Sequence, residues 1–178
     1  MPASSSRSLP RALVRAQVAL ESFSLSPDGE HVVYTLRRVR RDAYESHLWS
    51  RPTRGGRPRQ LTRGKTRDGS PVISPDGRFV AFVRSPSADE DAVAQAWVLP
   101  LDGGEPWQLT SLKHGVNSLV WSPSGDRLAL VARAGDARFI VGEERKGRTP
   151  LARRITRLDF RDDDTGHVDR RSHLWIMP

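Results

Sequence analysis

Short apolar segments alternate with turn-forming residues along most of the chain. After Ser26-Pro27-Asp28-Gly29, residues 32–34 read Val-Val-Tyr, and the segments after two later Ser-Pro-x-Gly sequences read Val-Ala-Phe and Leu-Ala-Leu. Alternation of large and small apolar residues with a period of two is typical of a strand that is buried on both faces. Helical periodicity is nearly absent, and the one candidate helix is short, around Arg11–Ala19. The pattern predicts an all-β protein.

The Ser-Pro-x-Gly sequence recurs every 48 residues, beginning at Ser26, Ser74 and Ser122. Other positions keep this spacing without a gap, namely Trp49 and Trp97, Pro52 and Pro100, Gly55-Gly56 and Gly103-Gly104, Pro58 and Pro106, and Gln60–Thr62 and Gln108–Thr110. Self-similarity at a fixed period is the signature of a repeat architecture. The chain is therefore built from copies of one structural unit.

Each 48-residue unit carries the signals of four strands. The Ser-Pro-x-Gly turn joins the first two strands, the third carries the repeated Trp, and a Gly-Gly hairpin leads to a fourth that ends in Gln-Leu-Thr. Four short antiparallel strands with tight turns describe one blade of a β-propeller of the TolB or WD-repeat kind. A solenoid of another kind is the alternative. The Trp and Tyr/Phe columns recur at equivalent blade positions, so we interpret them as core between blades.

The third unit is interrupted and incomplete. Trp175 matches Trp97 by its context, but about thirty extra residues, roughly 134–173, separate the second and third strands. The Gly-Gly turn and the Gln-Leu-Thr strand are missing from this unit. We expect a disordered or short helical lead-in over 1–13 and an incomplete propeller over 14–178. Its blades are expected at about 17–62, about 66–110 and, for the partial third blade, about 115–178.

The size of the repeat limits what this chain can form alone. A propeller typically has four to eight blades, and the 178 residues hold two blades and most of a third. We expect either a fragment of a longer protein or a chain that assembles with others. The open ends of the stack would expose apolar residues, and a strand edge near Trp175 and Ile176 would stay unpaired. We therefore expect the isolated chain to be oligomeric or poorly soluble.

Composition excludes several classes of protein. Hydrophobic residues make up 37% of the chain and charged residues 28%, with 14 Gly and 13 Pro, as in a soluble, turn-rich globular domain. The absence of Cys excludes a disulfide scaffold, a thiolate metal site and a cysteine nucleophile. No apolar run approaches the length of a membrane helix, and the N-terminal sequence has no hydrophobic signal-peptide core. We expect a cytoplasmic protein.

The net charge of +8 is concentrated in residues 37–67. Two acidic residues, Asp42 and Glu45, lie in this segment. Its eleven basic residues are Arg37, Arg38, Arg40, Arg41, Arg51, Arg54, Arg57, Arg59, Arg63, Lys65 and Arg67. The segment falls mostly on two inter-strand connections, which favours a solvated rim. A docking face for an acidic partner and a nucleic-acid surface are alternatives, but stacking aromatics do not interleave with the arginines, which argues against nucleic acid.

Motifs that would carry chemistry are absent or incomplete. No serine has glycine at both −2 and +2, so a nucleophile elbow is missing. Gly64-Lys65-Thr66 lacks the first glycine of a phosphate loop, and Asp162–Gly166 lacks the later Gly and Glu of a calcium loop. The latter segment is better interpreted as a turn between two strands. The histidines are scattered, at His31, His47, His114, His167 and His173. The sequence predicts no catalytic, cofactor-binding or metal-binding residue.

Several segments together resemble one family. Leu25–Gly29, His47–Trp49, Gly55-Gly56 and Gln60–Thr62 are similar to the N-terminal propeller of bacterial prolyl oligopeptidase-family serine peptidases, of the acylaminoacyl-peptidase and dipeptidyl-peptidase types. The insertion is the more specific part. Its segments, which resemble a stretch found there after the second or third blade, are Ala152–Arg161, Asp164–His167 and Asp169–Trp175. The resemblance extends from about Val14 to Pro178. The Ser-Pro-Asp-Gly repeats alone are shared with TolB-type propellers.

This resemblance implies the gating and docking half of a serine peptidase. In such enzymes a propeller precedes an α/β-hydrolase domain, restricts access to short or acylated peptides, and the reaction needs no metal or organic cofactor. The catalytic domain is absent from this chain, so the chain alone is expected to be inactive. Its expected partners are that missing domain and, in the full-length enzyme, a short peptide. No membrane partner is expected, and nucleic acid is disfavoured. The alternative is a non-catalytic TolB-like or WD-repeat-like propeller that binds proteins.

Overall fold

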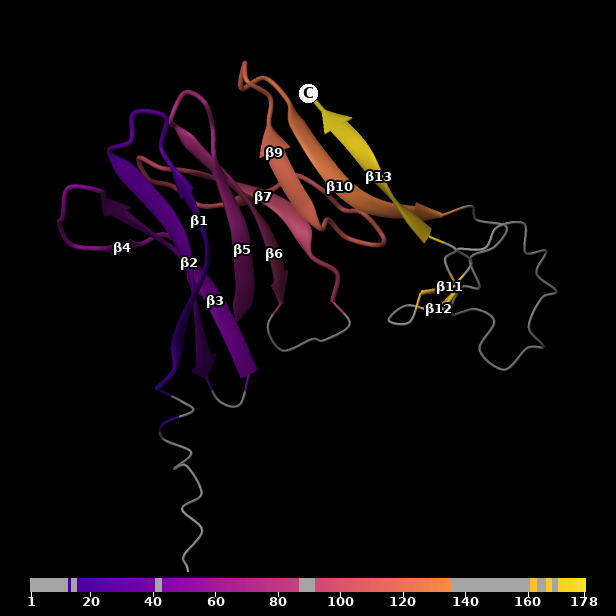
Figure 1. Cartoon of the computed structure of the whole chain (residues 1–178), viewed down its shortest axis with the longest axis horizontal. Helices are drawn as coiled ribbons and strands as arrows, with labels where there is room; N and C mark the ends of the chain where they lie inside the picture. Colours follow the sequence, from indigo (N-terminus) through magenta and orange to yellow (C-terminus); the bar gives the residue numbers. More distant parts are fainter. Residues whose placement is uncertain are drawn as a thin grey trace, which may run out of the picture.

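The computed structural model describes Leu13 and residues 16–40, 43–86, 92–135, 161–162, 166–167 and 170–178. Within these ranges the regular structure is almost entirely β, as the sequence predicts. Three twisted groups of antiparallel strands lie side by side like neighbouring blades of a propeller (Figure 1). Among the described residues, no helix is long and apolar enough to cross a membrane.

The first two groups are complete four-stranded blades with the same topology. Each strand pairs antiparallel with the next one along the chain. Blade 1 consists of β1 (Val18–Leu25), β2 (His31–Arg40), β3 (Ala43–Pro52) and β4 (Arg59–Gln60). Blade 2 consists of β5 (Thr66–Ile73), β6 (Phe79–Pro86), β7 (Gln95–Pro100) and β8 (Trp107–Gln108). A parallel bridge between Ser46 and Arg67 joins the two blades into one sheet.

Blade 3 has three strands in the described part of the chain, with the order β13-β10-β9. Its strands are β9 (Ser118–Trp121), β10 (Leu128–Gly135) and β13 (Arg170–Met177). β10 and β13 pair over eight residues, and β13 lies at the edge of the sheet. The edge predicted near Trp175 and Ile176 is therefore present.

The predicted insertion, roughly 134–173, overlaps the end of β10 and the start of β13, and residues 136–169 connect these two strands. The described residues of this connection form a small antiparallel hairpin of β11 (Arg161–Asp162) and β12 (Gly166–His167). These two strands lie at the ends of Asp162–Gly166, for which a turn between strands is predicted. The other residues of this connection, including nearly all of the Ala152–Arg161 segment of the family resemblance, lie outside the described residues.

Two apolar cores separate the blades, one on each side of blade 2. The core between blades 1 and 2 contains Val33, Leu48, Ile73, Val80, Phe82 and Leu99. The core between blades 2 and 3 contains Ala81, Ala96, Val98, Val116, Leu119, Leu128 and Leu130. β6 serves both cores because successive side chains of a strand point to opposite faces, so Phe82 faces blade 1 and Ala81 faces blade 3. Phe82 is fully buried and Trp97 packs on the same core, which confirms the inter-blade role predicted for these two residues.

A network around one serine builds the Ser-Pro-Asp-Gly turn. In blade 2 the Ser74 hydroxyl accepts a hydrogen bond from Phe79 N at 2.9 Å and donates one to Asp76 Oδ1 at 2.5 Å. Asp76 Oδ1 also accepts from the backbone N of Arg78 at 3.0 Å. Gly77 adopts a φ of 72°, in the left-handed region that glycine enters without steric cost. The motif therefore fixes how the first strand of a blade meets the second.

Blade 3 keeps this turn with a different acid. Ser26 and Asp28 in blade 1 repeat the network of blade 2, with the same atoms as partners. In blade 3, Ser124 stands at the position that Asp28 and Asp76 occupy in blades 1 and 2. Asp126, two residues later, accepts from both Ser124 and Ser122 instead, and Ser122 still accepts from Arg127 N at 3.1 Å. The turn thus depends on the first serine and on a nearby carboxylate, whose position can change.

Two local predictions are wrong in part. The helix predicted around Arg11–Ala19 does not reach its expected end, because Val18 and Ala19 are paired with β2 as the start of β1. The arginines at 37, 38 and 40 lie in the paired end of β2 rather than in a connection, because β2 and β3 form a hairpin that is ten residues long on each side. The first basic connection is therefore shorter than predicted.

Candidate functional site

Two pockets open between neighbouring blades, at the end of the stack where the Ser-Pro-x-Gly turns lie. The first pocket, between blades 1 and 2, is lined by Ser26, Asp28, His31, Val33, Ser50, Pro52, Arg57, Arg59, Gly77 and Leu101. The second pocket, between blades 2 and 3, is lined among others by Ser74, Asp76, Phe79, Val98, Trp107 and Gly125. These six residues stand 48 positions after Ser26, Asp28, His31, Ser50, Arg59 and Gly77. The two pockets are therefore repeat-related copies of one position in the fold.

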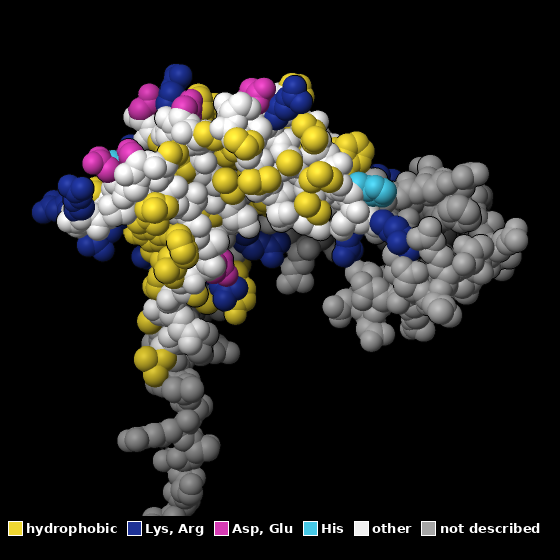
Figure 2. Space-filling model, turned by 45° about the horizontal axis from the view of Figure 1, so that its top comes forward, with side chains coloured by type: hydrophobic (Ala, Val, Ile, Leu, Met, Phe, Trp, Pro, Cys, Tyr) yellow, Lys and Arg dark blue, Asp and Glu magenta, His cyan; other side chains and the backbone are white. Residues whose placement is uncertain are grey.

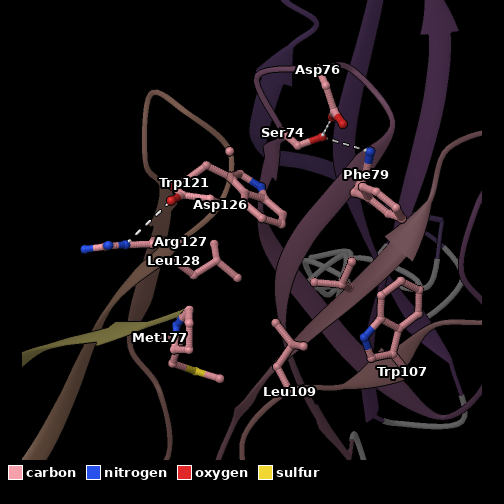
Figure 3. A pocket seen from close by; sticks show the side chains of 13 residues that line it. Ser74, Asp76, Phe79, Trp107, Leu109, Trp121, Asp126, Arg127, Leu128 and Met177 are labelled. Carbon is pink, nitrogen blue, oxygen red and sulfur yellow. Dashed lines mark hydrogen bonds and ion pairs between the residues drawn. The ribbon is translucent and has the colours of Figure 1, made fainter.

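The second pocket is apolar inside and has a volume of about 210 Å³. Figure 3 shows Trp121, Leu128 and Met177 on one side and Phe79, Leu109 and Trp107 on the other. The rings of Phe79 and Trp107 pack edge to face, with centroids 6.0 Å apart. The indole of Trp121 is fixed because its Nε1 donates to the carbonyl of Val72 at 3.0 Å. A pocket smaller than the roughly 300–1,000 Å³ of most small-molecule sites suits a single apolar side chain.

Two carboxylates stand at the rim of the second pocket. The Ser74 hydroxyl and the backbone N–H of Arg78 hold the pKa of Asp76 below its ordinary value. Hydrogen bonds from Ser124 and Ser122 lower the pKa of Asp126 in the same way. Both groups are therefore negatively charged at neutral pH, and the exposed Arg127 lies 3.7 Å from Asp126. The rim is charged while the interior is apolar.

The first pocket has a different chemistry and a volume of about 440 Å³. The aromatic residues of the second pocket are replaced, with His31 at the position of Phe79 and Arg59 at that of Trp107. Arg59 donates a hydrogen bond to the carbonyl of Leu101, which ties β4 of blade 1 to the loop after β7 of blade 2. Arg57 also lines this pocket. The first pocket is therefore polar and basic.

A buried ion pair lies in the same interface, near the opposite ends of β5 and β6. Arg84 donates to both oxygens of the Asp68 carboxylate, at 2.7 and 2.9 Å, and Asp68 is completely buried. The Arg84 guanidinium stacks over Trp97 at 4.8 Å and Phe82 at 5.1 Å. Across the interface, Ser46 Oγ donates to the backbone carbonyl of Asp68 at 2.8 Å. This polar cluster fastens blade 2 to blade 1.

His47 lies near this cluster, in the column that blade 2 fills with Gln95. Gln95 Oε1 accepts hydrogen bonds from Thr110 Oγ1 at 2.8 Å and from Leu112 N at 2.9 Å. His47 Nδ1 is buried and has no hydrogen-bond partner in the described part of the chain. Burial lowers the pKa of His47, and the carboxylates of Asp68 and Glu45 oppose this effect. At neutral pH His47 is therefore uncharged.

Within the described ranges, no three His, Asp or Glu side chains lie close enough together to hold a metal ion. Gly64-Lys65-Thr66 lies in the link between β4 and β5, without the strand-loop-helix context of a phosphate loop. Histidines lie in four separate strands, with His31 in β2, His47 in β3, His167 in β12 and His173 in β13.

The sequence analysis missed both the pockets and the ion pair. A signal for the pair exists in the repeat, because position 68 is Leu20 in the first unit and Val116 in the third, and position 84 is Leu36 and Ala132. Opposite charges at two columns that are otherwise apolar indicate a pair. The sequence carries no comparable signal for the pockets, because they form only where two particular blades pack against each other.

Comparisons with known proteins agree with the fold. No protein-family model and no curated protein sequence matches this chain. Among solved structures, acylaminoacyl peptidase from Pyrococcus horikoshii aligns at 20% identity over 92% of this chain and 24% of its own, with a TM-score of 0.67. The β-propeller domain of the Trilobed protease from Pyrococcus furiosus aligns at 25% identity over 65% of this chain and 34% of its own, with a TM-score of 0.52.

TolB from Acinetobacter baumannii aligns at 20% identity over 67% of this chain and 27% of its own, with a TM-score of 0.47. The chain thus spans a quarter to a third of the length of these three structures. The chain has the fold of a partial β-propeller, similar to the propeller regions of the two Pyrococcus structures.

Proposed function

We propose that this chain is the propeller part of a cytoplasmic serine peptidase that hydrolyses short or acylated peptides. In that enzyme the propeller restricts access to the active site and docks against an α/β-hydrolase domain. The chain itself supplies no nucleophile elbow, so its role is in binding and gating rather than in chemistry. The implied reaction, attack of a serine hydroxyl on an acyl group followed by hydrolysis, is performed by residues outside these 178.

One observation carries this proposal. The alignment with the P. horikoshii acylaminoacyl peptidase covers 92% of the chain at a TM-score of 0.67. The two complete blades, residues 18–108, make up only about half of the chain, so that alignment extends beyond them. At 20% identity this is a similarity of fold, and the activity is our inference from it.

The proposal is tested on the polypeptide as the source cells make it. An antibody raised against residues 18–135 captures the endogenous protein, which is then treated with a fluorophosphonate probe and with an N-acyl-peptide p-nitroanilide. We expect a labelled band much larger than 19.9 kDa and hydrolysis that the probe abolishes. The purified 178-residue chain serves as the control and should show neither labelling nor hydrolysis.

Two other results decide against the proposal. Captured protein that stays unlabelled and inactive would favour the alternative, a non-catalytic TolB-like or WD-repeat-like propeller that binds proteins. Labelling of the purified 178-residue chain would place a reactive serine within this sequence and would contradict the gating role. Both results are read on the same gel, with a known serine hydrolase as the positive control.

A further inference from the structure

The connections after the third strand carry opposite charges in blades 1 and 2. Residues 51–65 in blade 1 contain six Arg and Lys and no acidic residue. The equivalent residues 99–113 in blade 2 contain Asp102, Glu105 and Lys113, so their net charge is −1. A local charge of +6 creates a positive potential that attracts anions to this end of blade 1.

The fold does not require these arginines. Both connections turn through Gly-Gly pairs with positive φ, of 102° and 126° in blade 1 and of 135° and 128° in blade 2. Both return to the same pairing, with Trp49 opposite Gln60 and Trp97 opposite Gln108. Blade 2 forms this backbone with Glu105 and Trp107 where blade 1 has Arg57 and Arg59. The geometry of the turn therefore does not account for the basic residues at these positions.

Two of these arginines line the first pocket. Its volume of about 440 Å³ lies within the range of small-molecule sites. Arg59 uses one nitrogen to donate to the carbonyl of Leu101, which leaves further N–H groups of its guanidinium for a ligand. Pro52 and Leu101 give the pocket an apolar part. Such a site combines a charged anchor with room for a short apolar body.

The turn between β1 and β2 contributes the one acidic group among the lining residues of this pocket, Asp28. Asp28 accepts hydrogen bonds from the Ser26 hydroxyl and from Glu30 N, which lower its pKa and keep it charged. An anion would therefore be repelled by Asp28 and attracted by Arg57 and Arg59. Guanidinium groups bind carboxylates through paired hydrogen bonds, which makes a carboxylate the ligand group of best fit.

We propose that the first inter-blade pocket binds a carboxylate between Arg57 and Arg59, with the apolar body of the ligand against Pro52 and Leu101. The carboxylate belongs to the C-terminus of a short peptide or to an acidic side chain. This binding site is independent of the peptidase proposal, because it depends only on residues of this chain.

The site is tested by calorimetric titration of the 178-residue chain with three probes at low salt. The probes are acetyl-Ala-Ala-Leu with a free C-terminal carboxylate, the same peptide amidated, and an amidated peptide with one Glu side chain. Saturable binding of the first probe but not the second assigns the C-terminal carboxylate, and binding of the third assigns the side chain. Absence of binding by both carboxylate probes overturns the proposal.

The repeat supplies matched variants. Arg57→Glu and Arg59→Trp introduce the residues that blade 2 already carries at these columns, so both are compatible with the turn. Arg54→Asp, which copies Asp102, changes the net charge as much as Arg57→Glu but lies outside the pocket lining. We expect the pocket variants to weaken binding about tenfold or more, and Arg54→Asp to weaken it less than about twofold.

Three controls keep this test decisive. Circular dichroism melts establish that each variant is folded, and Arg57→Lys, which keeps the charge but loses the planar fork, should weaken binding by an intermediate factor. Equal weakening by Arg54→Asp and Arg57→Glu would mean a diffuse electrostatic effect and would overturn the site. Tighter binding of a short oligothymidylate than of either carboxylate probe, with the same loss in every arginine variant, would also overturn it, in favour of a nucleic-acid surface.

Discussion

Asp68 and Arg84 face each other across β5 and β6, and the guanidinium of Arg84 donates to both oxygens of the buried carboxylate. In blade 1 the same two positions are Leu20 and Leu36, which also face each other across two strands. The fold therefore accepts either an ion pair or two leucines at one cross-strand position. Blade 2 has the ion pair where its face is packed against another blade.

This relationship predicts strongly non-additive stability. Arg84→Leu should lower the free energy of unfolding by about 3–5 kcal/mol, because it leaves the Asp68 carboxylate buried without a partner. The double variant Asp68→Leu/Arg84→Leu, which copies blade 1, should be within about 1 kcal/mol of the parent or more stable. Urea unfolding of the parent, both single variants and the double variant measures the coupling. If the double variant loses as much stability as the two single variants together, the two side chains are not energetically coupled, which would contradict this prediction.

The turn serines should differ in importance with their burial. Ser74→Ala removes the acceptor for Phe79 N in a nearly buried position, so it should lower the free energy of unfolding by about 1–3 kcal/mol. Ser122→Ala removes the equivalent acceptor for Arg127 N in a more exposed turn, where water can replace it, and should have a smaller effect. Chemical denaturation of both variants makes the comparison. Equal losses would mean that burial does not decide the value of this hydrogen bond.

The free energy of unfolding should decrease in two separate steps as the pH is lowered. Burial places the pKa of His47 below its ordinary value of 6.5, so the unfolded chain binds this proton more readily than the folded one. Stability should therefore be complete above pH 6.5 and decline as the pH falls from there through the folded value. The pKa values of Asp28, Asp76 and Asp126 are held below 3.8 by serine hydroxyls, so their contribution is present above that pH and is lost below it.

The His47→Gln variant separates the two steps. Gln95 already occupies this column in blade 2, so the substitution is compatible with the blade. The urea midpoint of the variant should no longer decrease as the pH falls below about 6.5, but it should still decrease below about 3.8. An unchanged profile between pH 5 and 7 would assign that step to another group.

Both ends of the blade stack expose apolar faces that should promote self-association. Leu20, Phe23 and Leu25 of β1 are more than half exposed, and so are Leu174 and Ile176 of β13. Figure 2 shows hydrophobic side chains on the surface at both ends of the stack. Leu174 and Ile176 correspond by their context to Ala96 and Val98, which blade 2 buries against blade 3. Light scattering should therefore detect oligomers or aggregates of the isolated chain.

Charged substitutions on one face should reduce this association. The double variant Leu174→Lys/Ile176→Glu should raise the dissociation constant at least about tenfold, because it places charge on the apolar face. Tyr44→Lys, at an exposed position in the β2–β3 hairpin, is the control and should leave association unchanged. A monodisperse monomer of the parent chain with a cooperative melt would contradict the predicted self-association.

Much of the fold could be predicted because the repeat constrains it. Alternating apolar columns and Ser-Pro-x-Gly turns define the strands of blade 2, and Phe82 is buried between blades as its column predicts. The same column in blade 1, Tyr34, is only partly buried, because no blade packs on that side. A repeat predicts what each unit can form, whereas burial depends on the neighbour that each unit meets.

The polar features of the interface were harder to predict. Asp68 and Arg84 are sixteen residues apart, and their contact depends on a strand register that is shifted by a bulge between Gly69 and Val72. The Arg57 and Arg59 pair was visible only as part of a basic segment, since the sequence alone does not place both residues at one pocket. Register and blade order supply this information, and the sequence pattern contains neither.

The central claim, that this propeller belongs to a serine peptidase, is tested most directly in the coding DNA downstream of codon 178. The account predicts that the reading frame continues through further blades into a Gly-x-Ser-x-Gly elbow, followed by the Asp and His of a catalytic triad. A frame that ends without such an elbow, either at once or after more blades, would contradict it. In that case the chain would be a binding propeller, and the carboxylate pocket between blades 1 and 2 would remain its best-supported site.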